Sequence, residues 1–141
     1  MNIANELNIK FKRIKLKSHK ECDDEFEEMY NSAFDKEVLL GQYKQRLLYL
    51  EENIKTFRKR TQWFGILESN KRFSKIKFLN KKERNIRIIF YVLDNDPPVV
   101  ILLHAFEEKS GKDRNDKGYK VAADIAEKRL REVLFSNGKA K

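Results

Sequence analysis

The sequence has few of the residues on which many catalytic and metal sites depend. It contains a single cysteine, Cys22, which excludes a disulfide framework and a metal cluster of the Cys-x-x-Cys type. Its only histidines, His19 and His104, are far apart and have no carboxylates at ligand spacing, which argues against zinc, haem and a Ser-His-Asp triad. No glycine pattern of a phosphate-binding loop occurs. We therefore expect no metal and no cofactor, and chemistry that comes from lysine, arginine, tyrosine or a carboxylate.

Long apolar runs are also missing. No window approaches the run of about eighteen apolar residues that a transmembrane helix needs. The first residues, MNIANELNIKFKRIK, lack the apolar core of a signal peptide. The sequence therefore predicts a cytoplasmic protein without a membrane partner.

What the chain does have is positive charge and enough apolar residues for one core. Its 141 residues are 40% hydrophobic and include ten phenylalanines, which predicts a single domain over residues 1–141. Lysine and arginine outnumber aspartate and glutamate by 31 to 22, which leaves a net charge of +9. This excess predicts a polyanionic partner, which could be RNA, DNA or an acidic protein.

The first half of the chain predicts one strand and two helices. Residues 9–16, IKFKRIKL, alternate apolar and basic residues with a slip of phase, which indicates an edge strand with a bulge or strong twist. Two apolar stripes at helical spacing follow, and they predict a packed helical hairpin. The stripes consist of Cys22, Phe26, Met29 and Ala33, and of Leu40, Tyr43, Leu47, Leu50, Ile54 and Phe57. The segment RKRTQWFGILESN breaks the second pattern and predicts a loop anchored by Trp63 and Phe64.

The second half predicts three antiparallel strands and a last helix. The strand segments are RFSKIKFL, NIRIIFYVL and VVILLHAF, with a turn at DNDPP before the third. The third segment, Val99 to Phe106, is apolar on both faces, which is typical of a central strand. The last helix is predicted from about Asp116 to about Phe135. Its inward face is predicted to hold Ala122, Ile125, Ala126, Leu130, Val133 and Leu134. The order of elements predicts an α+β fold, with the N-terminal strand and helical hairpin packed on a mainly antiparallel sheet.

Basic residues lie on the predicted strands themselves. Lys75 and Lys77 are two positions apart, so they face the same side of their strand, and Arg87 can face them from the next strand. RNA cleavage by the 2′-hydroxyl requires proton removal, stabilisation of phosphoryl charge and protonation of the leaving oxygen. Crowded lysines can supply the base, because neighbouring cations lower the pKa of a lysine, and arginine can hold the phosphate. Tyr119 could stack on an unpaired base.

Each of these residues also has an ordinary structural explanation. A row of lysines on one strand is usually a solvated face or an edge that repels other strands. His104 ends an apolar run and is better interpreted as a hydrogen-bonded core residue than as a base. Tyr119 could simply pack in the first turn of the last helix.

The segment NIRIIFYVLDNDPPVVILLHAFEEKSGKD, followed by GYKVAADIAEKRL, resembles the RelE/ParE superfamily of type II toxins. The similarity covers residues 70–134 and is greatest to the phage-derived HigB-like branch. It implies a RelE-like fold and ribosome-dependent mRNA cleavage without metal. It also implies three partners: the ribosome, mRNA, and a cognate antitoxin, expected to carry a helix-turn-helix DNA-binding domain.

The resemblance also implies roles for individual residues. It makes Lys75 the candidate general base, Lys77 its electrostatic partner and Arg87 the phosphate-binding arginine. Tyr119 matches the tyrosine at the head of the last helix of RelE. Lys109 or Lys112 would act on the leaving group, and which of them does so, or whether Arg114 does, stays open. Arg84 and Arg114 complete the set as candidate substrate-binding residues.

Two alternatives remain open at this point. ParE proteins share the fold but inhibit DNA gyrase by binding, so this chain could be a non-enzymatic gyrase inhibitor. It could also be a degenerate member that binds RNA without cutting it. Three basic residues on one sheet face favour the ribonuclease over the gyrase inhibitor.

Overall fold

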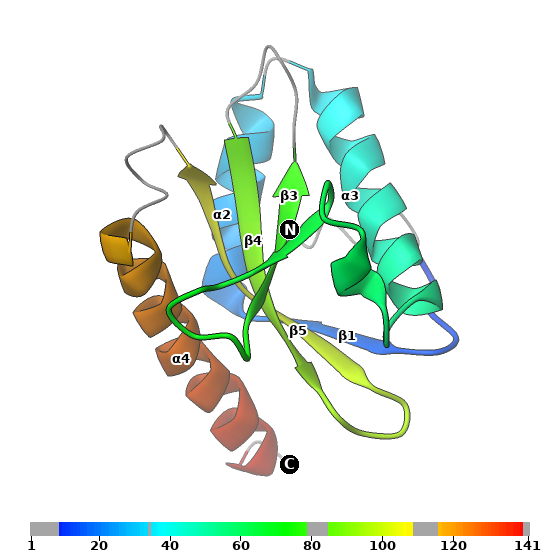
Figure 1. Cartoon of the computed structure of the whole chain (residues 1–141), viewed down its shortest axis with the longest axis vertical. Coiled ribbons are helices and arrows are strands. Elements are labelled where there is room, and N and C mark those ends of the chain that lie inside the picture. Colours follow the sequence, from blue (N-terminus) through cyan, green and yellow to red (C-terminus); the bar gives the residue numbers. More distant parts are fainter. Residues whose placement is uncertain (1–8, 34, 79–84, 109–115, 140–141) are drawn as a thin grey trace.

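The computed structural model describes residues 9–33, 35–78, 85–108 and 116–139, with side chains omitted for 116–118 and 136–139. These residues form a mixed α+β fold with a five-stranded sheet (Figure 1). The elements in chain order are β1 (Lys15–Ser18), α2 (Lys20–Asn31), α3 (Lys36–Glu52), the 3-10 turn η1 (Phe57–Lys59), β2 (Phe64–Ile66), β3 (Ser74–Phe78), β4 (Asn85–Leu93), β5 (Val99–Glu108) and α4 (Asp116–Lys139).

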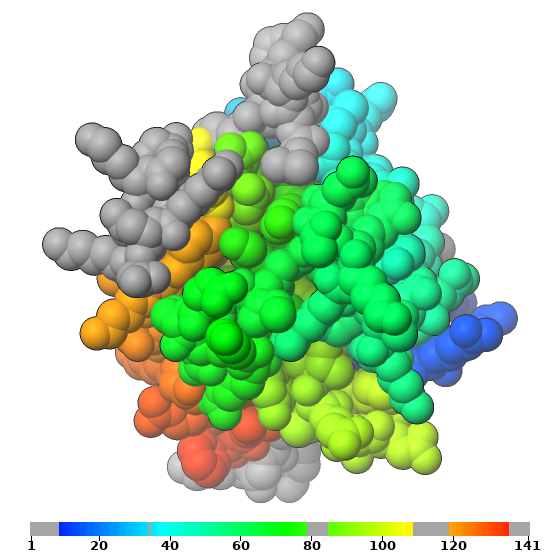
Figure 2. All heavy atoms as spheres, in the orientation of Figure 1, coloured from blue at the N-terminus to red at the C-terminus, as the bar shows by residue number. Residues whose placement is uncertain are grey.

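The sheet is covered by helices on both faces, which gives three layers. The strand order is β1-β5-β4-β3-β2, with β1 parallel to β5 and all other neighbours antiparallel. One buried cluster joins α2, α3 and η1 to one face of the sheet, and a second joins α4 to the other. Figure 1 shows α2 behind the strands, and in the same orientation Figure 2 shows α4 on the face turned to the viewer. The predicted α+β class and antiparallel meander are therefore confirmed.

The first strand is an edge strand, as predicted, but its predicted bounds are wrong. It begins only at Lys15, and residues 9–14 are not part of the sheet. The backbone amides of Lys12 and Arg13 donate to Oε2 of Glu51 in α3, at 2.6 and 2.7 Å. Because these amides are already bonded to a carboxylate, the alternating pattern upstream of Lys15 does not extend the strand.

The helical hairpin forms, and aromatic side chains join its two helices. The rings of Phe26 in α2 and Tyr43 in α3 stack with centroids 4.8 Å apart. His19 caps α2, because its Nδ1 accepts from the amide of Glu21, and Asp35 caps α3 in the same way. The second predicted apolar stripe extends beyond the helix, because α3 ends at Glu52. Phe57, the last residue of the stripe, is buried but belongs to η1.

The segment after the hairpin is the largest departure from the prediction. Phe64–Ile66, predicted as loop, forms β2 and pairs with β3, with Phe64 opposite Ile76. Three residues are too few to show an alternating pattern, so the sequence gives no strand signal there. The aromatic anchoring was correctly predicted: Phe64 is fully buried and Trp63 is partly buried.

The last two strands and the final helix match their predicted positions closely. β5 has neighbours on both sides over Val99–Leu102 and runs two residues past Phe106 to Glu108. Its register with β4 shifts at Ile89/Phe90, which is a β-bulge. α4 begins at Asp116, as predicted, and continues to Lys139. Of its predicted inward face, Ala122, Ala126 and Leu130 are buried, whereas Leu134 is 40% exposed.

Side chains from both helical layers close the edge of β5 beyond the end of β1. Glu25 of α2 accepts from the amide of Ala105 at 3.1 Å, and Arg129 of α4 donates to the carbonyl of Leu103 at 3.0 Å. Arg129 and Glu25 also form an ion pair, with a 2.7 Å contact between Nη1 and Oε1. The two helical layers therefore meet around this edge.

Among the described helices, none is long and apolar enough to cross a membrane.

Candidate functional site

The structure places the predicted basic residues of the sheet on one face. Lys77 lies directly opposite Arg87 across β3 and β4, and Lys75 lies opposite Ile89 in the same ladder. Directly opposed residues of an antiparallel pair share a face of the sheet. Lys75, Lys77 and Arg87 therefore share one face, as the sequence predicted, and this is the face that α4 covers.

A glycine in β2 makes room for the two lysines. Gly65 is the register partner of Lys75, and a Cβ atom on it would lie 2.8 Å from Cε of Lys75 and 3.2 Å from Cε of Lys77. Both lysine side chains therefore lie across the backbone of the edge strand. Any larger residue at position 65 would displace them.

Tyr119 connects α4 to this face of the sheet. Nζ of Lys75 donates to Oη of Tyr119 at 3.1 Å and also lies 4.2 Å from the centroid of its ring. The hydroxyl of Tyr119 in turn donates to Oε2 of Glu108 at the end of β5. Burial and then the hydrogen bond to Glu108 raise the pKa of Tyr119, so the phenol stays protonated at neutral pH.

The ring of Tyr119 is less available for base stacking than the sequence suggested. It is 8% exposed, and Phe106 packs against it edge-on with centroids 6.0 Å apart. Stacking of a base on this ring would require Lys75 to move from its face.

Arg87 is held inside the protein by a carboxylate. Its side chain is 5% exposed, and its Nε lies 3.3 Å from Oε2 of Glu108, whose side chain is 4% exposed. The angle of this contact is too poor for a hydrogen bond, while Nη1 donates to the carbonyl of Ile86 at 3.0 Å. Glu108 thus accepts from Tyr119 and neutralises Arg87, which joins β4, β5 and α4 at one point.

Lys77 is tied to the loop that precedes β2. Its Nζ donates to the carbonyl of Thr61 at 2.8 Å, and its backbone carbonyl accepts from Nε of Arg46 in α3 at 2.8 Å. Burial and then repulsion from Arg60 lower the pKa of Arg46 to about 10. Both guanidinium groups contact the ring of Trp63, with Arg60 3.4 Å and Arg46 4.7 Å from its centroid. Cationic side chains thus line this loop as well as the sheet.

Four of the predicted site residues fall outside the described residues. They are Arg84, Lys109, Lys112 and Arg114. The ends of β4 and β5 that flank their segments lie beside each other, since Asn85 is the register partner of Glu108.

His104 has the structural surroundings that the sequence predicted. It is 9% exposed, its Nδ1 lies 3.0 Å from Oε1 of Glu25, and its ring stacks on Phe106. It belongs to the cluster that closes the edge of β5 and lies apart from Lys75 and Lys77.

Glu108 and Gly65 are the members of the site that the sequence did not identify. Glu108 follows Phe106 at a spacing of two, so it could have been placed on the same strand face as the basic residues. That signal was hidden because Glu107 and Glu108 appear as the start of a charged loop. Gly65 could not be identified before β2 was known to be a strand.

Among the described residues, no group of histidine, cysteine, aspartate or glutamate is arranged to hold a metal ion. Comparison with known proteins adds nothing to this geometry: no family model, no curated protein and no solved structure matches the chain.

Proposed function

We propose that the protein is a metal-independent endoribonuclease of the RelE/HigB kind, with a RelE-like fold. In this proposal it acts in the cytoplasm as the toxin of a type II toxin-antitoxin pair. It cleaves mRNA on the ribosome and is held inactive by an antitoxin with a helix-turn-helix domain.

The observation that supports the proposal is the close grouping of Lys75 and Lys77 over Gly65. The side chains of Lys75 and Lys77 lie close together on one sheet face and form a local excess of positive charge, whereas Arg87 beside them is neutralised by Glu108. An anion placed between the two lysines would relieve their mutual repulsion. The net charge of +9 favours approach to a ribosome, which is strongly anionic.

The proposed reaction is a transesterification within the RNA strand. The 2′-oxygen forms a bond to the adjacent phosphorus while the bond from phosphorus to the 5′-oxygen breaks, which leaves a 2′,3′-cyclic phosphate and a 5′-hydroxyl end. Lys75, as the neutral amine, takes the proton of the 2′-hydroxyl and becomes an ammonium, and the Lys77 ammonium stabilises the phosphoryl oxygens. Tyr119 accepts a hydrogen bond from Nζ of Lys75 at 3.1 Å and thereby positions this nitrogen. We assign protonation of the leaving 5′-oxygen to Lys109 or Lys112.

A second candidate function is favoured by the position of Arg87. An arginine that is 5% exposed and neutralised by Glu108 is poorly placed to hold a phosphate. If Arg87 serves only to join strands, the basic face could bind RNA without cutting it. The same experiment distinguishes the two functions.

The test compares two double variants in purified ribosomes programmed with a defined mRNA. Lys75→Ala/Lys77→Ala removes the proposed catalytic pair. Lys15→Ala/Lys17→Ala removes the same charge at the same spacing from the opposite edge strand, where both lysines are exposed. Circular dichroism and urea unfolding establish that both variants fold.

We expect codon-phased cuts from the wild type and from the Lys15/Lys17 variant, and a loss of at least about a hundredfold from the Lys75/Lys77 variant. Equal cleavage by both double variants would rule out this basic face as the active site. A wild-type protein that binds the RNA but leaves it intact would favour the second candidate.

A further inference from the structure

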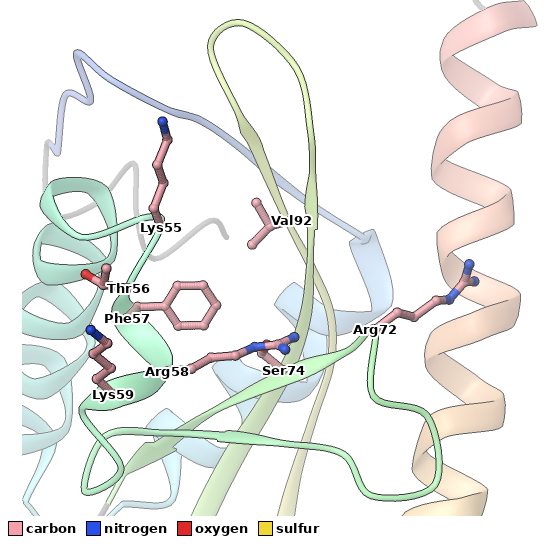
Figure 3. A pocket seen from close by; sticks show the side chains of 8 residues that line it. All are labelled: Lys55, Thr56, Phe57, Arg58, Lys59, Arg72, Ser74 and Val92. Atoms are coloured by element: carbon pink, nitrogen blue, oxygen red, sulfur yellow. The ribbon is translucent and has the colours of Figure 1, made fainter.

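A second basic site lies on the other face of β3. Ser74 precedes Lys75 in the strand, so the two side chains point to opposite faces of the sheet. On the Ser74 face, η1 and the ends of β3 and β4 enclose a pocket of about 450 Å³. Figure 3 shows the side chains that line it. They are Lys55, Thr56, Phe57, Arg58, Lys59, Arg72, Ser74 and Val92.

All charged residues that line the pocket are cations. Of the described residues that line it, four are cations and none carries a carboxylate. Arg72 points away toward α4, where it pairs with Glu127, so its charge is compensated (Figure 3). Lys55, Arg58 and Lys59 remain, and none of them pairs with a described carboxylate. Such a pocket attracts an anion.

Arg58 is held in place before any ligand binds. Its Nε donates to Oγ of Ser74 at 2.9 Å, and Nη2 donates to the carbonyl of Lys71 at 3.2 Å. Both acceptors are uncharged, so they fix the plane of the guanidinium without neutralising it. A planar donor group fixed in this way loses little entropy when it binds a phosphate.

The lining favours recognition of charge over recognition of a base. The ring of Phe57 is 6% exposed and packs on Phe64 and Phe90, so little of it is left for stacking. Three cations without an exposed aromatic face suit a phosphate group.

We propose that this pocket binds a backbone phosphate of single-stranded RNA, as a second contact point for the strand that lies on Lys75 and Lys77. The inference rests on the proposed RNA-directed function. The route between the two sites is short, because β2 is the edge strand beside β3 and has three residues. An RNA strand that crosses this edge would contact both faces of β3.

The test uses fluorescence anisotropy with a labelled single-stranded RNA of eight nucleotides and purified protein, without ribosomes. Lys55→Ala/Lys59→Ala removes two exposed cations of the pocket. Lys20→Ala/Lys128→Ala removes two exposed lysines from α2 and α4 and is the control for net charge. Arg58→Lys keeps the charge but loses the fixed guanidinium, so it tests the geometry.

We expect the Lys55/Lys59 variant to bind the RNA about five- to tenfold more weakly than the control variant at moderate salt. The slope of log K against log salt should become less steep by about 1.4, the value for two phosphate contacts on a single strand. Arg58→Lys should weaken binding severalfold with net charge unchanged. Equal affinity and slope in the two double variants would overturn the proposal.

Three competitors test which kind of anionic ligand the pocket binds. Inorganic phosphate, adenosine 5′-monophosphate and a glutamate-rich peptide are each titrated against the labelled RNA. Weak competition by all three supports an RNA strand. Competition by the nucleotide or the peptide as strong as that of unlabelled RNA would overturn the proposal in favour of a free nucleotide or an acidic protein.

The two proposals fail in distinguishable ways. Loss of RNA affinity in the Lys55/Lys59 variant, with cleavage that does not depend on Lys75 and Lys77, would overturn the proposed active site alone. Cleavage that depends on Lys75 and Lys77, with unchanged RNA affinity in the Lys55/Lys59 variant, would overturn the second site alone.

Discussion

Arg87 and Glu108 form a buried ion pair where β4 begins and β5 ends beside α4, with 3.3 Å between Nε and Oε2. Lys77, the register partner of Arg87, has its ammonium directed to Thr61 instead. Neighbouring cations on one sheet face therefore differ in role, since one is neutralised inside the protein and the other reaches across the edge strand.

Removal of the negative charge from Glu108 should destabilise the protein strongly. In Glu108→Gln the Arg87 guanidinium stays buried but loses its negatively charged partner. We therefore expect the free energy of unfolding to fall by about 3 kcal/mol. The pKa of Tyr119 should also fall, because Glu108 contributes to its elevation after burial does. Urea unfolding measures the first effect. The double change Arg87→Met/Glu108→Leu removes both charges and should recover most of the lost unfolding free energy. If it lost as much unfolding free energy as Arg87→Met and Glu108→Leu lose together as single variants, the pairing would be contradicted.

Gly65→Ala should impair cleavage with little effect on stability. The added Cβ would meet the flexible ends of Lys75 and Lys77, which can swing away, so we expect unfolding free energy to change by less than about 1 kcal/mol. The displaced lysines should reduce cleavage about tenfold or more. The matched control is Gly41→Ala in α3, where nothing lies within 4 Å of the new Cβ. It should stabilise the protein by about 0.5–1 kcal/mol and leave cleavage unchanged.

Stability should fall in acid because of Glu25. Burial opposes ionisation of Glu25, but hydrogen bonds from His104 and Arg129 outweigh it and lower the pKa to about 2, from an ordinary value of 4.5. A carboxyl whose pKa is lower in the folded state stabilises the protein fully above its unfolded pKa. That contribution, up to about 3 kcal/mol, should disappear as the pH falls from about 5 to about 2.

Urea unfolding across this range measures the acid effect, with Glu25→Gln for comparison. The variant should lose less stability between pH 5 and pH 2 than the wild type does. Parallel curves for the two proteins would contradict the assignment to Glu25.

Cys22 should be inert toward thiol reagents in the folded protein. It is 2% exposed, and burial followed by the nearby charge of Glu25 raises the pKa of its thiol. We expect labelling by a disulfide reagent at pH 8 to follow the rate of unfolding. Labelling within seconds in the absence of denaturant would show that α2 opens from the sheet far more readily than its packing implies.

Helices and strands with a long apolar pattern could be predicted from the sequence. Elements whose position depends on contacts with distant residues could not. The face of α2 that contains Phe26 follows directly from helical spacing, and the burial of Val99 on β5 follows from an uninterrupted apolar run. β2 is too short to carry a period, and the start of β1 is set by amides that bind the distant Glu51. No local pattern records such a contact.

The candidate site divides in the same way. The shared face of Lys75 and Lys77 follows from the period of a strand, and the opposition of Lys77 and Arg87 required only a correct hairpin register. The burial of Arg87 was not predictable, because it depends on a carboxylate at the far end of β5 and on Tyr119 from another helix. Composition indicates how many cations there are but not which of them are neutralised.

A β-sheet is exposed to aggregation wherever a strand edge can pair with another molecule. At the β5 edge beyond β1, the carboxylate of Glu25 and the guanidinium of Arg129 already occupy backbone groups of Ala105 and Leu103. At the opposite edge, β2 offers only three residues, too short a ladder to hold a foreign strand. In the part of the chain that the structure describes, side-chain hydrogen bonds thus cover the β5 edge beyond β1, and the edge strands β1 and β2 have only four and three residues. The sheet can therefore carry a cationic face while it offers only short edges to a foreign strand.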